Sequence, residues 1–202
     1  MCAYEIKDGV AIIPEGTTKI DNEAFWDCVE LVSVIIPDGV TEIGEYAFYG
    51  CSNLVKITLP MGITTIGKRA FYKCAALADI VIPESVTMIG DSAFYGCTGL
   101  TKVTGGKSLL TIGKSAFQGC KKLKTVSISS KKLKTIGAKT FYGCKSLTKI
   151  TLKTTKLTKK SVGKSAIKKT NKKLVIKVPK KKVAVYKKYF KGKGNNKAVV
   201  KK

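Results

Sequence analysis

The chain has 202 residues, 44% of them apolar, with 37 lysines, one arginine, no histidine and a formal net charge of +25. No apolar run approaches the roughly 18 residues that a membrane-spanning helix needs. Without histidine the usual catalytic triads cannot be built, and no carboxylate follows Asp91 to form an acid–base pair. The sequence therefore indicates a protein with no catalytic residues, no cofactor and no membrane span.

One short phrase, Ala-Phe-aromatic-x-Cys, recurs along the chain, and its clearest copy is residues 47–51. Successive copies are separated by 23, 23, 23, 23 and 24 residues, counted between the central phenylalanines, which are Phe25, Phe48, Phe71, Phe94, Phe117 and Phe141. A fixed period in the twenties is typical of stacked repeats. We therefore predict a repeat solenoid, mixed β with short helical turns, in which stacking buries the apolar columns that no single coil can bury alone.

Residues 1–14 are expected to form an N-terminal cap. Asp8-Gly9 is a strong hairpin signal that follows the apolar Ile6. Residues 10–14 then predict the first strand, which Pro14 closes because proline cannot donate a hydrogen bond to a ladder.

Residues 31–51 contain one complete coil of the repeat. Alternating apolar positions predict a strand over residues 31–37, with a second short extended piece over residues 40–44. We expect Gly44 to end this piece with a positive φ. Residues 45–51 are expected to make about two helical turns that bury the Phe and the Cys on one face.

The solenoid is predicted to span residues 15–179, with six regular coils and a degenerate seventh at residues 157–179. In the seventh coil, Thr170 stands at the Cys position and Ala166-Ile167 replaces Ala-Phe. The later coils keep the apolar positions of the earlier ones, while their surface positions become lysine. The pattern thus indicates a conserved core period under a changing surface.

Residues 180–202 predict a Lys-rich C-terminal cap, because a solenoid needs its last apolar face covered. Residues 180–191 have the apolar spacing of an amphipathic helix, and residues 198–200 are expected to return as a last strand. The apolar positions of this helix are Val183, Tyr186 and Phe190.

Two further columns follow the same period. Six of the seven cysteines share one position of the repeat, at residues 28, 51, 74, 97, 120 and 144. We expect inert, buried thiols there. Neighbouring coils are about 4.8 Å apart, so a disulfide between cysteines of adjacent coils stays possible. Because the chain has no His and no Cys-x-x-Cys motif, no metal site is expected. The aromatic column of residues 26, 49, 72, 95 and 142 is expected to pack ring on ring rather than to bind a sugar.

Charge changes abruptly along the chain. All 13 carboxylates lie at or before Asp91, so residues 1–91 carry a net charge of −7, whereas residues 92–202 carry +32. Such asymmetry indicates a polyanionic partner for the basic half. The candidate polyanion contacts are Lys180, Lys181, Lys182, Lys187 and Lys188.

The outward positions of the predicted strands form the broadest open surface, and repeat proteins often bind partners with such a face. A plain solvated face explains the same pattern, and both interpretations stay open here. The candidate partner surface consists of Ser33, Ile35, Lys56, Thr58, Asp79, Val81, Lys102, Thr104, Thr125, Ser127, Lys149 and Thr151.

The motif I-P-x-x-V-T-x-I-G-x-x-A-F-x-x-C-x-x-L-x-x-I-x-I-P, which covers about residues 10–152, resembles the BspA-like leucine-rich repeats of bacterial surface proteins. The Lys-rich ending is similar to segments that accompany such repeats in gut-dwelling Gram-positive bacteria. The resemblance implies a right-handed solenoid, secretion or surface display, and a role in adhesion or protein binding, with no fixed functional residues.

We therefore expect a monomeric, non-catalytic leucine-rich repeat protein, extracellular or at the cell surface, that binds a protein or an anionic polymer of the cell envelope or host. Two alternatives remain: an end segment of a larger protein, and non-specific binding of nucleic acid. Lysine neutralises phosphates, but sequence readers favour arginine for base contacts, so we expect no specific nucleic-acid partner. Residues 1–9 contain no apolar leader.

Overall fold

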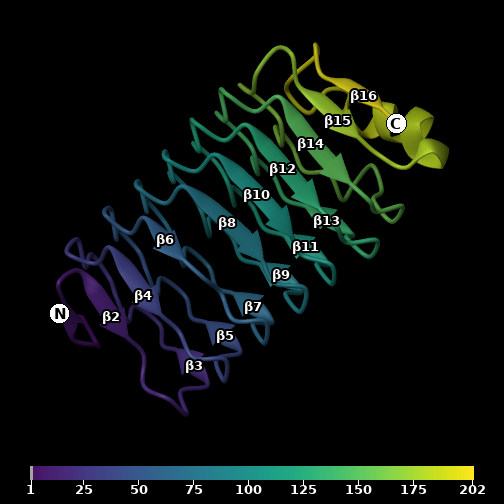
Figure 1. Cartoon of the computed structure of the whole chain (residues 1–202). Helices are drawn as coiled ribbons and strands as arrows, with labels where there is room; N and C mark the ends of the chain where they lie inside the picture. The colour runs from purple at the N-terminus through teal and green to yellow at the C-terminus, as the bar shows by residue number, and fades with distance from the viewer. Residues whose placement is uncertain (1) are drawn as a thin grey trace.

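The computed structural model describes residues 2–202. The chain forms a solenoid in which each coil lies on the previous one, with the two termini at opposite ends (Figure 1). One side of every coil carries the longer strands and a second side carries strands of two residues; we call them the long-strand side and the short-strand side. The predicted repeat solenoid is therefore confirmed.

The long-strand side consists of β2 (Val10–Ile12), β4 (Ser33–Ile35), β6 (Lys56–Ile57), β8 (Asp79–Ile82), β10 (Lys102–Gly105), β12 (Thr125–Ile128), β14 (Lys149–Leu152), β15 (Val175–Lys177) and β16 (Val199–Lys201). Its ladder is parallel from β2 to β6 and again from β8 to β16. The strands β6 and β8 do not pair with each other, so the long-strand side is divided into two sheets.

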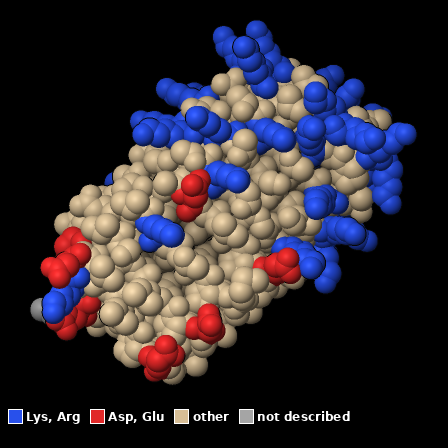
Figure 2. All heavy atoms as spheres, in the orientation of Figure 1, with Lys and Arg blue, Asp and Glu red and all other residues tan. Residues whose placement is uncertain are grey.

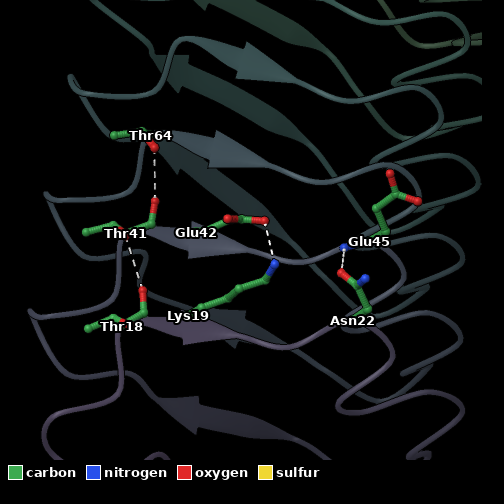
Figure 3. A network of polar contacts seen from close by, with 7 residues as sticks. All are labelled: Thr18, Lys19, Asn22, Thr41, Glu42, Glu45 and Thr64. Atoms are coloured by element: carbon green, nitrogen blue, oxygen red, sulfur yellow. Dashed lines mark hydrogen bonds and ion pairs between the residues drawn. The ribbon is translucent and has the colours of Figure 1, made fainter.

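The short-strand side is one six-stranded parallel sheet. Its strands are β3 (Lys19–Ile20), β5 (Glu42–Ile43), β7 (Thr65–Ile66), β9 (Met88–Ile89), β11 (Thr111–Ile112) and β13 (Thr135–Ile136). Polar side chains add contacts between neighbouring coils on this side (Figure 3). Thr41 Oγ1 donates to the Thr18 carbonyl at 3.2 Å, and Lys19 Nζ lies 3.0 Å from Glu42 Oε1. Because both ionic side chains are about 40% exposed, this ion pair contributes at most about 1 kcal/mol.

The third side of each coil is a chain of turns, so the two helical turns expected at residues 45–51 are not formed. Tyr46 and Gly50 have φ angles of 57° and 73°, which no α-helix tolerates. Because these residues are in the left-handed region, alternate backbone N–H groups of the segment point toward the next coil. As a result Phe48 N–H donates to the Ala70 carbonyl of the next coil at 2.7 Å.

The expected positive φ at Gly44 was also wrong, because Gly44 is absent from the residues with positive φ. A Cβ atom at Gly44 would lie 2.7 Å from both the Ile20 carbonyl oxygen and Asn22 Oδ1 of the preceding coil. Glycine is thus required here by the close approach of two backbones rather than by its own conformation.

Columns of identical side chains fill the core. The rings of Phe25, Phe48, Phe71, Phe94, Phe117 and Phe141 are at most 1% exposed, and successive centroids lie 5.0–5.7 Å apart. Inward aliphatic residues from the long-strand side and the short-strand side surround this stack. The repeat period therefore corresponds to one layer of core.

The N-terminal end of the stack is closed by the predicted hairpin, in which β1 (Ile6–Lys7) pairs antiparallel with β2. Tyr4 stacks on Phe25, with centroids 5.3 Å apart. Cys28 forms a disulfide with Cys2, so the expectation of a free, inert thiol at Cys28 was wrong. The segment carrying Cys2 folds back over the first coil, and the repeat spacing alone does not specify that contact.

The C-terminal end is covered by a single 3₁₀ turn (Lys180–Lys182), the helix α1 (Val183–Phe190) and β16. Tyr186 is fully buried; its hydroxyl donates to the Thr154 carbonyl at 3.2 Å and accepts from the Leu157 N–H at 3.1 Å. β16 continues the long-strand ladder by pairing parallel with β15. The predicted helix and terminal strand are present, while the boundaries at residues 14 and 179 stay a prediction.

Candidate functional site

The parallel register lines up most of the twelve candidate partner residues in columns on the long-strand side, which are interrupted where β6 and β8 do not pair. Ser33 pairs with Lys56, and Lys102 pairs with both Asp79 and Thr125. Ser33 and Lys56 form one pair of neighbours, Asp79, Lys102, Thr125 and Lys149 form one column, and Val81, Thr104, Ser127 and Thr151 form the column beside it. Ile35 and Thr58 have no strand partner among the twelve. All twelve side chains are exposed or partly exposed, which a binding face requires.

The register also extends these columns to residues that sequence reasoning missed. Ile12 pairs with Ile35, Lys177 with Thr151 and Lys201 with Lys177. The alternation of inward and outward positions along the first and last strands would have indicated these residues. It was overlooked because those strands were assigned to the ends of the stack.

The N-terminal part of this face is apolar. Ile12, Ile35 and Val81 are 66%, 57% and 66% exposed. Where β6 and β8 fail to pair, a hollow of about 560 Å³ opens, and its lining includes Val81 and Met61, the latter 65% exposed. A concentration of exposed apolar side chains of this kind marks surfaces that contact other macromolecules.

The C-terminal part of the molecule is covered by lysine, whereas the acidic side chains lie toward the N-terminal end (Figure 2). Two hollows, of about 620 and 690 Å³, occur in the lysine-rich part. The first is lined by Lys131, Thr151, Leu152, Lys153, Thr155, Lys177, Val178, Pro179, Lys181 and Lys202. The second is lined by Glu84, Ser85, Lys107, Ser108, Ser129, Lys131, Lys132 and Lys153.

The five candidate polyanion contacts belong to the C-terminal helical segment. Lys180, Lys181 and Lys182 form the 3₁₀ turn before α1, and Lys187 and Lys188 lie in the last turn of α1. The last two face the negative end of the helix dipole and stabilise the helix, whereas cations at the N-terminal end oppose the dipole. No acidic residue in the first turn offsets these three lysines.

The free thiols are unreactive for a physical reason. Cys51, Cys74, Cys97, Cys120 and Cys144 are buried, and each Sγ donates to a phenylalanine carbonyl of the preceding coil at 2.9–3.1 Å. Burial raises the pKa of Cys51 to about 12 and holds the pKa of Cys74 and of Cys120 well above its usual value. Because the thiolate is the nucleophile and the metal ligand, this column supplies no chemistry at neutral pH.

The outer aromatic column packs as expected from Trp26 to Tyr95; Gln118 interrupts it, and Tyr142 has Lys169 Nζ over its ring at 5.4 Å. Trp26 stacks on Tyr49 at 4.2 Å, and Tyr49, Tyr72 and Tyr95 follow at 4.8 and 4.7 Å. Rings at this spacing cover each other's faces. The stacked rings therefore leave no slot for a sugar between them.

Cys2, Cys28 and Glu30 bring two sulfur atoms and a carboxylate within 4.8 Å of one another. Both sulfur atoms belong to the disulfide, so only the carboxylate is available as a metal ligand. Within residues 2–202, no helix combines the length and the apolar character needed to cross a bilayer.

A sequence profile described as the BspA type leucine rich repeat region, in 6 copies, matches residues 9–84 and 64–197. Among solved structures, a leucine-rich repeat protein of T. pallidum shares 31% identity over 89% of this chain and 82% of that chain, with a TM-score of 0.76. No protein of curated function matches this chain.

A leucine-rich cell surface protein of Faecalibacterium prausnitzii A2-165 shares 35% identity over 63% of this chain, with a TM-score of 0.59. The match covers 33% of that protein, so the matched part of this chain corresponds to about one third of its length. Because the profile match extends over most of the chain and the coils stack as the repeat period requires, the chain belongs to the BspA-type leucine-rich repeat family of bacterial proteins.

Proposed function

We propose that this protein is a non-catalytic, extracellular or surface-displayed binding module that acts as a monomer in adhesion. Its apolar and acidic N-terminal half contacts a protein partner through the long-strand side. Its basic C-terminal half contacts an anionic polymer of the cell envelope or the host. Membership of a leucine-rich repeat family supports the protein-binding part, since stacked repeats form extended binding faces.

The observation that carries the proposal is the segregation of two surface types along one axis. Nine of the eleven large, exposed hydrophobic side chains precede Asp91, as do all 13 carboxylates, whereas the stretch after Asp91 has a net charge of +32. Solubility alone does not require this arrangement, because charges of both signs mixed over the surface would serve it. Two different partners explain it.

The extracellular assignment rests on two observations. The disulfide between Cys2 and Cys28 is of the kind that persists in oxidising compartments. The similar protein of F. prausnitzii is described as a cell surface protein. The monomeric state is supported by the hairpin at one end and α1 at the other, which cover the terminal core layers.

The lysines before α1 support the polyanion part. Lys180, Lys181 and Lys182 stand at the positive end of the helix dipole, where each costs about 0.3–1 kcal/mol of helix stability. A cluster of lysines that opposes the stability of the helix is best explained by a contact that the free protein lacks.

The protein-binding part is tested with immobilised fibronectin, collagen and mucin. We expect saturable binding to at least one of them, and its loss in each of the single variants Ile35→Asp and Val81→Asp. Met88→Asp is the matched control, because Met88 is 43% exposed but lies on the short-strand side. Absence of binding to all three proteins, or equal losses in the two variants and their control, would refute adhesion through the long-strand side.

The polyanion part is tested with heparin beads at 0.05 M and 0.5 M salt. Retention is expected only at the lower salt concentration, where attraction between charges is less screened. The triple variant Lys180→Gln/Lys181→Gln/Lys182→Gln should elute at a lower salt concentration than Lys114→Gln/Lys139→Gln/Lys164→Gln, which removes the same charge from the exposed turns of earlier coils. Equal elution would contradict a role for the lysines before α1.

A further inference from the structure

The two hollows of the lysine-rich half share two lining residues, and we call the pair of hollows the trough. Lys131 and Lys153 line both of them, so the hollows are adjacent. Their lining residues lie at the C-terminal ends of the long strands or in the segments that directly follow them. The trough therefore crosses successive coils along one edge of the stack, from Lys107 to Lys202.

The two shared lysines sit on ordered segments. Ser130, next to Lys131, is fully buried, and its Oγ accepts the Lys132 N–H at 2.9 Å. Thr154, next to Lys153, is also fully buried, and its Oγ1 donates to the Leu133 carbonyl at 2.6 Å. These contacts fix the backbone from which the lysines project, so the cations have defined spacing although their side chains are flexible.

The charge of the trough is almost entirely positive. Its one acidic residue, Glu84, lies at the N-terminal end and pairs with Lys107 at 3.1 Å. Coils are about 4.8 Å apart, so lysine ammonium groups recur along the trough at short intervals. A small anion would contact one or two of them, whereas a chain with repeated charges would contact the whole series.

The lining also limits the kind of polymer. Lysine is a point charge suited to phosphate oxygens. Proteins that bind single-stranded nucleic acid combine such cations with aromatic side chains on which the bases stack. No aromatic residue is among the residues that line either hollow. The apolar lining is aliphatic instead, with Leu152, Val178 and Pro179.

We propose that this trough binds a linear phosphate-bearing polymer without aromatic bases, laid across the coils from Lys107 to Lys202. The proposal rests on the polyanion part of the proposed function and extends its site from the lysines before α1, of which Lys181 lines the trough, across the neighbouring coils. The same chemistry occurs in polyol-phosphate polymers of cell walls and in inorganic polyphosphate.

The test measures affinity by fluorescence anisotropy with labelled poly(glycerol phosphate) and labelled polyphosphate, at several salt concentrations. The variant is Lys131→Gln/Lys153→Gln, which removes the two shared cations. The matched control is Lys121→Gln/Lys145→Gln, because these lysines are exposed on the same two coils but line neither hollow. Circular dichroism melts check that both variants fold.

We expect the trough variant to bind at least about 10-fold more weakly than the wild type at 0.1 M salt, and the control to lose less than about threefold. The slope of log K against log salt should fall by about 1.4 in the trough variant, at about 0.7 per lost contact. The polymer that binds the wild type more tightly identifies the source of the ligand.

The outcomes separate the two proposals. A wild type that binds neither polymer would overturn the polyanion part of the proposed function and the trough with it. A wild type that binds while both variants lose affinity equally would overturn the trough alone, since net charge would then be sufficient. If the wild type bound oligothymidylate of the same charge as tightly as the phosphate polymers, the preference for a polymer without aromatic bases would be overturned.

Discussion

Replacing Phe71 by alanine tests whether the stacked columns hold the coils together. Phe71 is fully buried, and its ring lies 5.1 Å from both Phe48 and Phe94. A buried Phe→Ala change costs about 3–5 kcal/mol. Two aromatic contacts, each contributing about 0.5–1.5 kcal/mol beyond burial, place the expected loss near 5 kcal/mol.

Tyr72→Ala is the matched control in the same coil. Its ring has two stacking partners, at 4.8 and 4.7 Å, but it is partly exposed. We therefore expect a loss of about 1–3 kcal/mol from the two stacks. The free energy of unfolding is measured by urea titration with circular dichroism in the presence of a reductant. Phe71→Leu serves as a milder variant if Phe71→Ala does not fold, and equal losses at Phe71 and Tyr72 would refute the assigned inward face.

Two further predictions concern the thiol column and the glycine column. Burial raises the pKa of Cys51 to about 12 and that of Cys74 well above its usual value, whereas a thiol in the unfolded chain has a pKa of about 8.5. Each of these two thiols should therefore lower the free energy of unfolding as the pH rises above about 8.5, by about 1.4 kcal/mol per pH unit, because the unfolded state loses the proton and the folded state keeps it. Urea titrations between pH 8 and 10 should show a shallower decline in Cys74→Ala, and an unchanged decline would count against buried neutral thiols. A Cβ atom at Gly67 would lie 2.5 Å from the Gly44 carbonyl oxygen, whereas one at Gly62 has its nearest atoms at 3.5 Å. Thermal melts should thus show that Gly67→Ala costs about 3 kcal/mol and that Gly62→Ala is tolerated; similar effects would contradict the close approach of the coils.

Most of the candidate partner surface could be predicted from the alternation of the strands, because successive residues of a strand point to opposite faces. Ile35 and Val81 were identified in this way, and both are well exposed. The division of the face between β6 and β8 was not predicted. Whether two strands pair depends on how closely their coils approach, and a pattern of apolar residues within each strand does not encode that distance.

The trough shows a second limit. Lys131 and Lys153 were simply two of many lysines in the sequence, and no local motif distinguishes them from Lys121 or Lys145. They are brought together because they follow strands in neighbouring coils. Here the sequence supplied the charge, and the stacking supplied the concave surface.

By itself, the sequence determined that the chain is a stack of coils, because columns of Phe, Cys and aliphatic residues at a constant period can be buried only when coils lie on one another. Tertiary structure decided what happens where segments without that period meet the stack. It placed Cys2 on Cys28 and Tyr186 against Thr154 and Leu157. The folded chain also requires glycine at position 44, because the backbone of the preceding coil lies too close for a Cβ atom and not because of the φ angle of Gly44. The physical reason is that a period specifies which residues share a layer, whereas contacts between layers depend on distances that appear only when the backbone is folded.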